Sequence, residues 1–144
     1  MNTPCFTRAP RDRRRQESKG RGGLAVAELA VGLPILLLVT MGTIEACAMI
    51  RVKQKLNTIA YEGARVGILP EAGADNVQFQ CDTLAADYGL NNVGITMTPG
   101  DPGSLDSGEW FTVDVNVDYA DNSLVGTWMM PAVAITETVA LQRP

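Results

Sequence analysis

The sequence predicts an α+β protein in which a long N-terminal helix crosses a membrane once and a small head built on an antiparallel sheet follows. Three observations predict this class. A basic stretch precedes an uncharged apolar run of membrane length, that run passes into a helical pattern with one apolar face, and strand-like alternation appears only toward the C-terminus. At 144 residues, the chain has room for one compact domain beside the anchor.

Residues 1–23 form a basic leader that predicts how the chain crosses the membrane. The leader holds seven Lys and Arg residues against two acidic residues, a net charge of +5, and the rest of the chain holds five against fourteen, a net charge of −9. Because Lys and Arg beside a span stay in the cytoplasm, we expect a cytoplasmic leader and exported residues 70–144. The cluster Arg13–Arg15 could bind nucleic-acid phosphates on its own, but its place before a span favours orientation. No nucleic-acid partner is expected.

A single long helix is predicted over residues 24–69, with its transmembrane part at about 24–50. No charged side chain lies between Glu28 and Glu45, and the run is long enough to cross about 30 Å of hydrocarbon as a helix. Pro34 falls inside the helix, where it removes one backbone hydrogen bond and predicts a kink.

Glu28 is the most informative residue of the apolar run. A charged side chain inside a span costs about 2.5–3.5 kcal/mol on insertion scales, so a neutralising partner is expected. Glu28 is the fifth residue after Gly23, and glycine, an apolar residue and a glutamate at that place form the recognition pattern of prepilin peptidases. Cleavage after Gly23 would create an α-ammonium group on Leu24, able to neutralise Glu28 between neighbouring subunits. Gly23, Leu24 and Glu28 are therefore the predicted processing residues.

Other fates of this segment stay open. Glu28 could lie hydrated at the membrane edge without a partner. The run Ala46–Ala48 fits an ordinary signal-peptidase site, and Ile44–Cys47 faintly resembles a lipoprotein box. An uncleaved anchor is the remaining alternative.

Beyond the membrane, the helix is predicted to continue with one apolar face. Its residues recur at alternating four- and three-residue steps, and they are Val52, Leu56, Ile59, Gly63 and Val66. Glu62 and Arg65 lie three apart and are expected to pair on the helix surface. The run Glu62-Gly63-Ala64-Arg65 has two interpretations, an exposed turn with a gap between small residues or a contact surface for a neighbouring subunit.

The head, residues 70–144, is predicted to combine one short helix at 77–88 with about three antiparallel strands. The strands are expected at residues 93–98, 111–119 and 133–141, and alternation is clearest in the second of them. The connection Trp128–Pro131 is expected to pack in the core or to form an exposed apolar patch.

The residue types that carry chemistry argue against catalysis. Histidine is absent, which removes the commonest general base and metal ligand, and the three cysteines lack metal-ligand spacing. Asp114, Asp118 and Asp121 do not follow the spacing of a calcium-binding loop. No nucleophile–base pair, phosphate loop or dinucleotide fingerprint occurs. We therefore expect no enzyme activity, cofactor, metal or small-molecule substrate.

Five short motifs occur in order between Arg21 and Ile68, about a third of the chain. They are the glycine cut-point at Gly23, Val26-Ala27-Glu28, the Leu-Pro run Leu33–Leu37, the Gly-x-x-Glu element Gly42–Glu45 and the Glu-Gly-Ala-Arg element Glu62–Arg65. Together they resemble the N-terminal domain of the TadE family of Tad-pilus pseudopilins. Tyr61 stands where that family usually has arginine, and Ala46-Cys47 replaces an aromatic residue and a glycine. The sister TadF type shares much of the pattern, so either type fits.

The resemblance implies a type IV pilin-like fold and a minor structural subunit of a Tad/Flp-type adhesive pilus or a related secretion apparatus. It implies a single-pass protein of the bacterial inner membrane whose partners are a prepilin peptidase, other pilin or pseudopilin subunits and the pilus assembly platform. Glu45 and the run Glu62–Arg65 are then family-motif residues and candidate subunit contacts. The alternative function is a membrane-anchored extracytoplasmic binding module unrelated to pili, with conventional signal cleavage or an uncleaved anchor.

Overall fold

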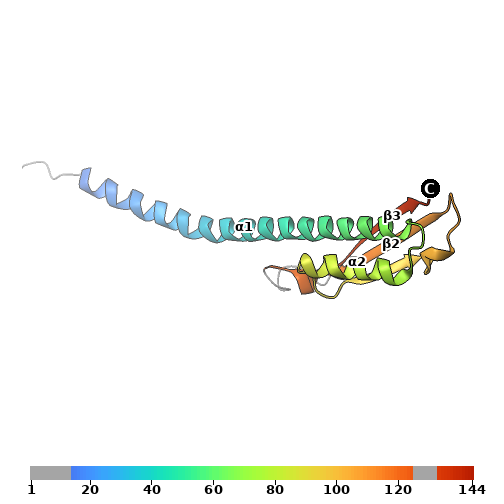
Figure 1. Ribbon diagram of the computed structural model, residues 1–144. Coiled ribbons are helices and arrows are strands. Elements are labelled where there is room, and N and C mark those ends of the chain that lie inside the picture. The colour runs from blue at the N-terminus through green and yellow to red at the C-terminus, as the bar shows by residue number, and fades with distance from the viewer. Residues whose placement is uncertain (1–13, 125–132) are drawn as a thin grey trace, which may run out of the picture. The chain divides into compact units, whose positions relative to one another are not determined.

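The computed structural model describes residues 14–124 and 133–144 (Figure 1), with side chains from Gly23 onward. The chain divides into two compact units, residues 1–40 and residues 41–144. The predictions for residues 1–13 and for the connection Trp128–Pro131 lie outside the described residues. The elements, in chain order, are α1 (Arg14–Gly67), α2 (Ala74–Asp87), β1 (Gly94–Thr98), the 3-10 helix η1 (Pro102–Ser104), β2 (Trp110–Asp118), the 3-10 helix η2 (Tyr119–Asn122) and β3 (Ala134–Gln142).

The predicted α+β class is confirmed. A long apolar helix occupies the N-terminal part of the chain, and a three-stranded antiparallel sheet with one shorter α-helix follows it. The strand order is β1-β2-β3, so β2 is the central strand and pairs antiparallel with both neighbours. The observed strands agree with the predicted ones to within one residue at each end, and α2 begins three residues before the predicted short helix.

Helix α1 begins at Arg14, inside the predicted leader, and ends at Gly67. It ends there because Pro70 cannot continue a helix and Glu71 has a φ of 65°. From Gly23 onward it is long enough, and apolar enough over part of its length, to cross a membrane. Pro34 lies within α1 without ending it, and the kink expected at that residue stays a prediction.

In the first unit, every described side chain of α1 is exposed. This holds from Gly23 through Thr40, and the large aliphatic residues among them are 47–68% exposed. Exposed apolar area is unfavourable in water by about 25 cal/mol per Å². The surface of this part of α1 is therefore suited to lipid or to apolar helices of other proteins.

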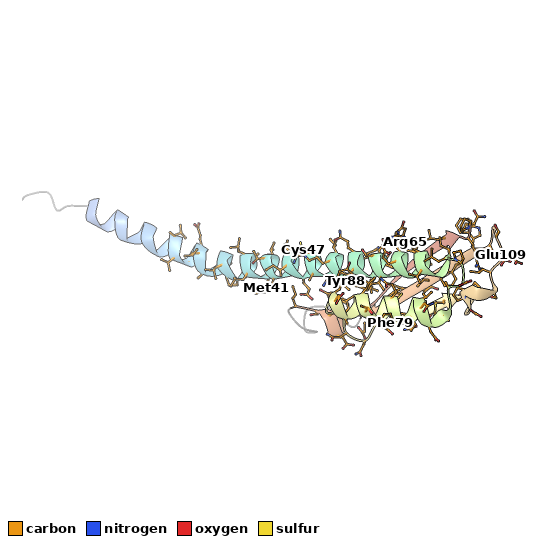
Figure 2. The ribbon with its side chains drawn as sticks, viewed as in Figure 1. Met41, Cys47, Arg65, Phe79, Tyr88 and Glu109 are labelled. Carbon is orange, nitrogen blue, oxygen red and sulfur yellow. The ribbon has the colours of Figure 1, made fainter. Side chains whose placement is uncertain are left out.

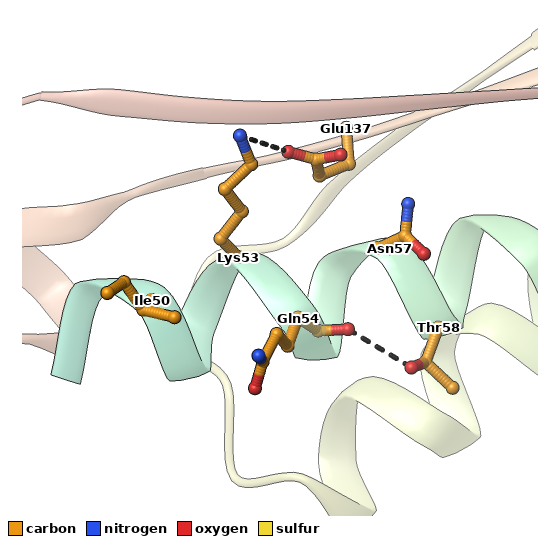
Figure 3. Close-up of a pocket in the computed structure, with 6 residues that line it drawn as sticks. All are labelled: Ile50, Lys53, Gln54, Asn57, Thr58 and Glu137. Atoms are coloured by element: carbon orange, nitrogen blue, oxygen red, sulfur yellow. Dashed lines mark hydrogen bonds and ion pairs between the residues drawn. The ribbon is translucent and has the colours of Figure 1, made fainter. Parts of the chain in front are cut away.

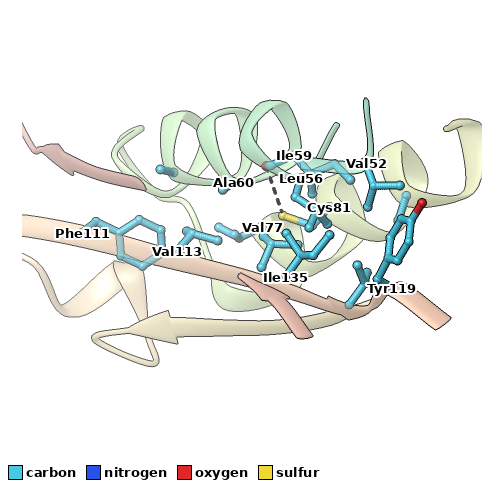
Figure 4. Close-up of a cluster of buried hydrophobic side chains, with 14 of the residues drawn as sticks. Val52, Leu56, Ile59, Ala60, Val77, Cys81, Phe111, Val113, Tyr119 and Ile135 are labelled. Carbon is cyan, nitrogen blue, oxygen red and sulfur yellow. Dashed lines mark hydrogen bonds between the residues drawn. The ribbon is translucent and has the colours of Figure 1, made fainter. Parts of the chain in front are cut away.

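The core of the second unit lies between the sheet and residues of both helices (Figure 4). The alternation predicted for β2 is observed, because its odd-numbered residues are buried and its even-numbered residues are not. The apolar face predicted for α1 is also buried from Val52 to Ile59. The principal core residues are Val52, Leu56, Ile59, Ala60 and Ala64 of α1, Val77, Cys81 and Ala85 of α2, and Phe111, Val113, Val115, Val117 and Ile135 of the sheet.

Two glycines allow α1 to approach its neighbours closely. A Cβ atom added at Gly63 would lie 2.5 Å from Sγ of Cys81, and one added at Gly67 would lie 2.0 Å from the ring of Phe111. Both distances are too short for any larger residue without movement of the neighbour. The glycines thus set how closely α1 packs on α2 and on β2.

Candidate functional site

The three processing residues lie on the exposed part of α1. Gly23, Leu24 and Glu28 are all exposed, and Leu24 is 65% exposed. Glu28 follows Leu24 by four residues, about 6 Å along a helix axis. Among the described residues, Glu28 forms no hydrogen bond or ion pair. The helix therefore presents this carboxylate on an apolar surface, where a partner from outside the chain can reach it.

Glu45 is in a different environment. It is 1% exposed, and it is the buried polar or charged residue in the core of the described chain. The hydroxyl of Tyr119 donates a hydrogen bond to Oε1 of Glu45 at 2.8 Å and also lies 3.2 Å from the backbone oxygen of Glu45. The pair joins α1 to the start of η2, directly after β2, so it fixes that end of the head on the helix.

Sequence reasoning identified Glu45 by its motif but missed its partner. Tyr119 was expected only as the last inward residue of a strand, and nothing local marks its hydroxyl as a donor to Glu45. Burial, followed by the hydrogen bond to Glu45 and the negative charge of Glu45, raises the pKa of Tyr119 to about 12. The phenol therefore stays protonated and remains a donor throughout the physiological pH range.

The Glu-Gly-Ala-Arg element divides into inward and outward residues. Gly63 and Ala64 are buried among core residues of the second unit. Glu62 and Arg65 pair as expected, with 3.5 Å between Nη1 and Oε2, and their side chains are partly or largely exposed. The candidate subunit contact therefore narrows to Glu62 and Arg65, because the two small residues between them are packed inside their own chain.

The basic residues just beyond the apolar run have distinct roles. Nζ of Lys53 lies 3.3 Å from Oε1 of Glu137 on β3 (Figure 3). Nζ of Lys55 donates to the backbone oxygen of Tyr88 at 2.8 Å, at the C-terminal end of α2 where positive charge is favourable. Arg51 is exposed and forms no hydrogen bond or ion pair among the described residues.

A shallow hollow lies between α1 and β3 around this ion pair. Its volume is about 480 Å³, and it is lined by Ile50, Lys53, Gln54, Asn57, Thr58 and Glu137 (Figure 3). The hydroxyl of Thr58 donates to the backbone oxygen of Gln54 at 3.0 Å. The charged groups in this hollow already satisfy each other, so it offers no activated nucleophile or base.

Comparison with known protein families connects these positions. Residues 23–65 match the TadE-like protein family. The matched segment, called the TadE-like segment below, runs from the glycine before Leu24 to the arginine of the Glu-Gly-Ala-Arg element, so the resemblance stated from the motifs is confirmed over this range. A search of curated proteins and a search of solved structures found no match. The family match implies a role related to the Tad pilus, with membrane association and pilus-subunit partners.

The TadE-like segment contains two kinds of surface. Its first part, through Thr40, is the exposed apolar helix with Glu28. Its last part, from Glu45 to Arg65, supplies one side of the core of the second unit, including the buried Glu45. The head beyond Arg65 lies outside the match, and the fold there is known from the structure alone.

The three aspartates of the head that were considered as calcium ligands accept hydrogen bonds from other groups of the chain. Asp114 accepts a hydrogen bond from Thr138, Asp118 accepts one from the backbone of Ala120 at 3.0 Å, and Asp121 accepts one from Asn92 at 2.7 Å. Over residues 14–124 and 133–144, no group of three potential ligands could hold a metal ion. Cys81 is buried in the core (Figure 4), whereas Cys47, labelled in Figure 2, is exposed.

Proposed function

We propose that this protein is a membrane-anchored, pseudopilin-like minor subunit that supports assembly of a Tad/Flp-type adhesive pilus or a related secretion apparatus. The observation that carries the proposal is the exposed, largely apolar surface of α1 from Leu24 through Thr40, in which Glu28 is the one charged residue. The family match over residues 23–65 supports it independently. The proposal assigns the protein no catalytic role.

Glu28 is the residue through which α1 would recognise other subunits. A prepilin peptidase cuts after Gly23, and the new α-ammonium of Leu24 neutralises Glu28 of an adjacent helix in an apolar, weakly screened environment. An intramembrane carboxylate without such a partner is costly, so the pairing selects the register between helices. Glu62, partly exposed, and Arg65, largely exposed, lie at the other end of the TadE-like segment and are the candidate contacts in the exported part.

The proposal places the basic leader in the cytoplasm and the acidic head outside, with α1 in the bacterial inner membrane. The partners are the prepilin peptidase, other pilin or pseudopilin subunits and the assembly platform. Lipid and helix contacts are then made by the exposed apolar side chains of the first unit.

The test combines N-terminal sequencing of the mature protein with Glu28→Gln and a count of pili by electron microscopy. We expect the wild-type protein to begin at Leu24, and Glu28→Gln to enter the membrane normally while pili are lost. The matched control is Glu71→Gln, which makes the same change on an exposed loop of the head.

Several outcomes contradict the proposal. A mature protein that begins at Met49, one lipidated on Cys47, or an intact leader in piliated cells supports conventional cleavage or a plain anchor instead. Normal piliation with Glu28→Gln excludes the proposed role of the carboxylate.

A further inference from the structure

The structure shows where the head begins to cover α1. Glu45 and Ala48 are the first buried side chains of the helix, and from Leu24 to Ile44 none is buried. A helix of the 21 residues from Leu24 to Ile44 is about 31 Å long at 1.5 Å per residue, and the hydrocarbon core of a bilayer is about 30 Å thick. If α1 spans a membrane, as the proposed function requires, the outer lipid boundary falls near Ile44.

A span that ends near Ile44 is shorter than the one expected at 24–50, because the head covers part of the helix from Glu45 onward. Tyr119 holds Glu45 through its hydroxyl, and the backbone nitrogen of Tyr119 donates to the oxygen of Val133 at 2.9 Å. Residues 45–50 therefore contact protein on one side and cannot be surrounded by lipid. The membrane-proximal end of the head lies at the level of Glu45.

Next to Glu45 along the chain, residues of α1 and Leu124 line a small, largely apolar hollow of about 190 Å³ on the surface of the second unit. Two large aliphatic side chains border it while remaining exposed, Leu124 at 70% and Ile44 at 49%. The lining residues are Thr43, Ile44, Cys47, Ala48, Arg51 and Leu124. We call Ile44, Arg51 and Leu124 the collar.

The charges near the collar indicate what covers it. Positive charge just after the span is unexpected on the exported side, and two of the three cations are explained by the pairing of Lys53 with Glu137 and of Lys55 with the Tyr88 oxygen. Arg51 alone has no partner among the residues that the structure describes. A guanidinium group binds phosphate oxygens through paired hydrogen bonds, and it lies here next to exposed apolar residues, as in interfacial membrane-binding surfaces.

We propose that the collar rests on the anionic phospholipid surface of the membrane that α1 spans. Arg51 binds a headgroup phosphate, and Ile44 and Leu124 contact the boundary between headgroups and acyl chains. This contact holds an acidic head against an acidic surface that would otherwise repel it. The inference rests on the proposed membrane anchoring.

The experiment uses the full chain reconstituted in vesicles of phosphatidylcholine and phosphatidylglycerol. A fluorescent label is attached to Leu124→Cys in a Cys5→Ser/Cys47→Ser background, and quenching by brominated phospholipid is measured. Buried Cys81 stays unlabelled. The matched positions are Phe79→Cys, equally exposed at 72% on α2 (Figure 2), and Leu36→Cys within the apolar helix.

We expect the labels at Leu36→Cys and Leu124→Cys to be quenched several-fold more than the label at Phe79→Cys. Arg51→Gln should reduce quenching at the collar toward the Phe79→Cys level when phosphatidylglycerol is present. Arg65→Gln removes the same charge fourteen residues farther along α1 and should leave quenching unchanged.

The possible failures are distinguishable. A label at Leu36→Cys without quenching contradicts the membrane anchor and with it the collar. Quenching at Leu36→Cys but not at Leu124→Cys leaves the anchor intact and overturns the collar alone. If the Leu124→Cys label becomes less accessible to both water and lipid as the protein-to-lipid ratio rises, a second copy of the protein covers the collar. The lipid proposal is then wrong. An equal effect of Arg51→Gln and Arg65→Gln overturns the phosphate contact.

Discussion

The hydroxyl of Tyr119 donates a hydrogen bond to the carboxylate of Glu45, across 2.8 Å in space and 74 residues of sequence. Glu45 belongs to the TadE-like segment, whereas Tyr119 belongs to the head that lies outside it. The bond therefore joins the part of the chain that resembles a known family to the part that does not. Four predictions concern this joint and the packing around it.

Removal of the Tyr119 hydroxyl should destabilise the second unit. Hydrogen bonds to charged groups contribute about 1.5–3 kcal/mol, so Tyr119→Phe should lower the free energy of unfolding by that amount. Urea denaturation in detergent, followed by tryptophan fluorescence, measures the change. The control is Tyr61→Phe, because Tyr61 is 48% exposed on α1 and has no hydrogen bond among the described residues. Equal losses in both variants would contradict the role of the pair.

The stability of the second unit should fall in strongly alkaline solution. The pKa of Tyr119 rises from its ordinary value of 10.0 to about 12 because of burial first and Glu45 second. A raised pKa in the folded state means that the stabilisation is complete below about pH 10 and is lost as the pH rises toward 12. Unfolding measured across this window should show a decline that Tyr119→Phe lacks. Phenolate absorbance of the two proteins should differ by one late-titrating tyrosine.

Gly63→Ala should destabilise the protein by about 1–3 kcal/mol through overpacking. Its Cβ would lie 2.5 Å from Sγ of Cys81, and both atoms are enclosed by the core. Cys81→Ala removes that sulfur, so the double variant should lose less than the sum of the two single variants. Gly100→Ala serves as the control, since an added Cβ there meets no atom within 4 Å. Strict additivity of the two losses would exclude the contact.

The two cysteines within the described residues should differ sharply in reactivity. Cys47 is exposed, whereas Cys81 is buried, and burial followed by the charge of Asp82 raises the pKa of Cys81 to about 11. A thiol reacts as its thiolate, so Cys81 should be inert near neutral pH until the protein unfolds. Mass spectrometry of a Cys5→Ser protein treated with maleimide in detergent should find one label in the native state and two in urea. A second label before unfolding would show that the packing around Cys81 opens.

The sequence by itself determined the elements of this protein. Apolar length marked the long N-terminal helix, alternation placed β2, and the spacing of apolar residues from Val52 to Ile59 identified the buried face of α1. The motif around Glu28 and the Glu62–Arg65 pair were also readable. All of these signals are local, because the periods of helix and strand appear within a few turns or residues.

Only the tertiary structure decided what the motif residues touch. Gly63 lay on the predicted apolar face, yet the run Glu62–Arg65 was also a candidate contact for a neighbouring subunit. The packing of α1 against α2 and β2 puts Gly63 and Ala64 inside the core. The sequence marked Glu45 only as a motif residue, and the fold of the chain after β2 places the hydroxyl of Tyr119 beside it. This contact lies where the head begins to cover the helix. Such contacts depend on how elements far apart in sequence are placed against one another, and no local periodicity encodes that placement.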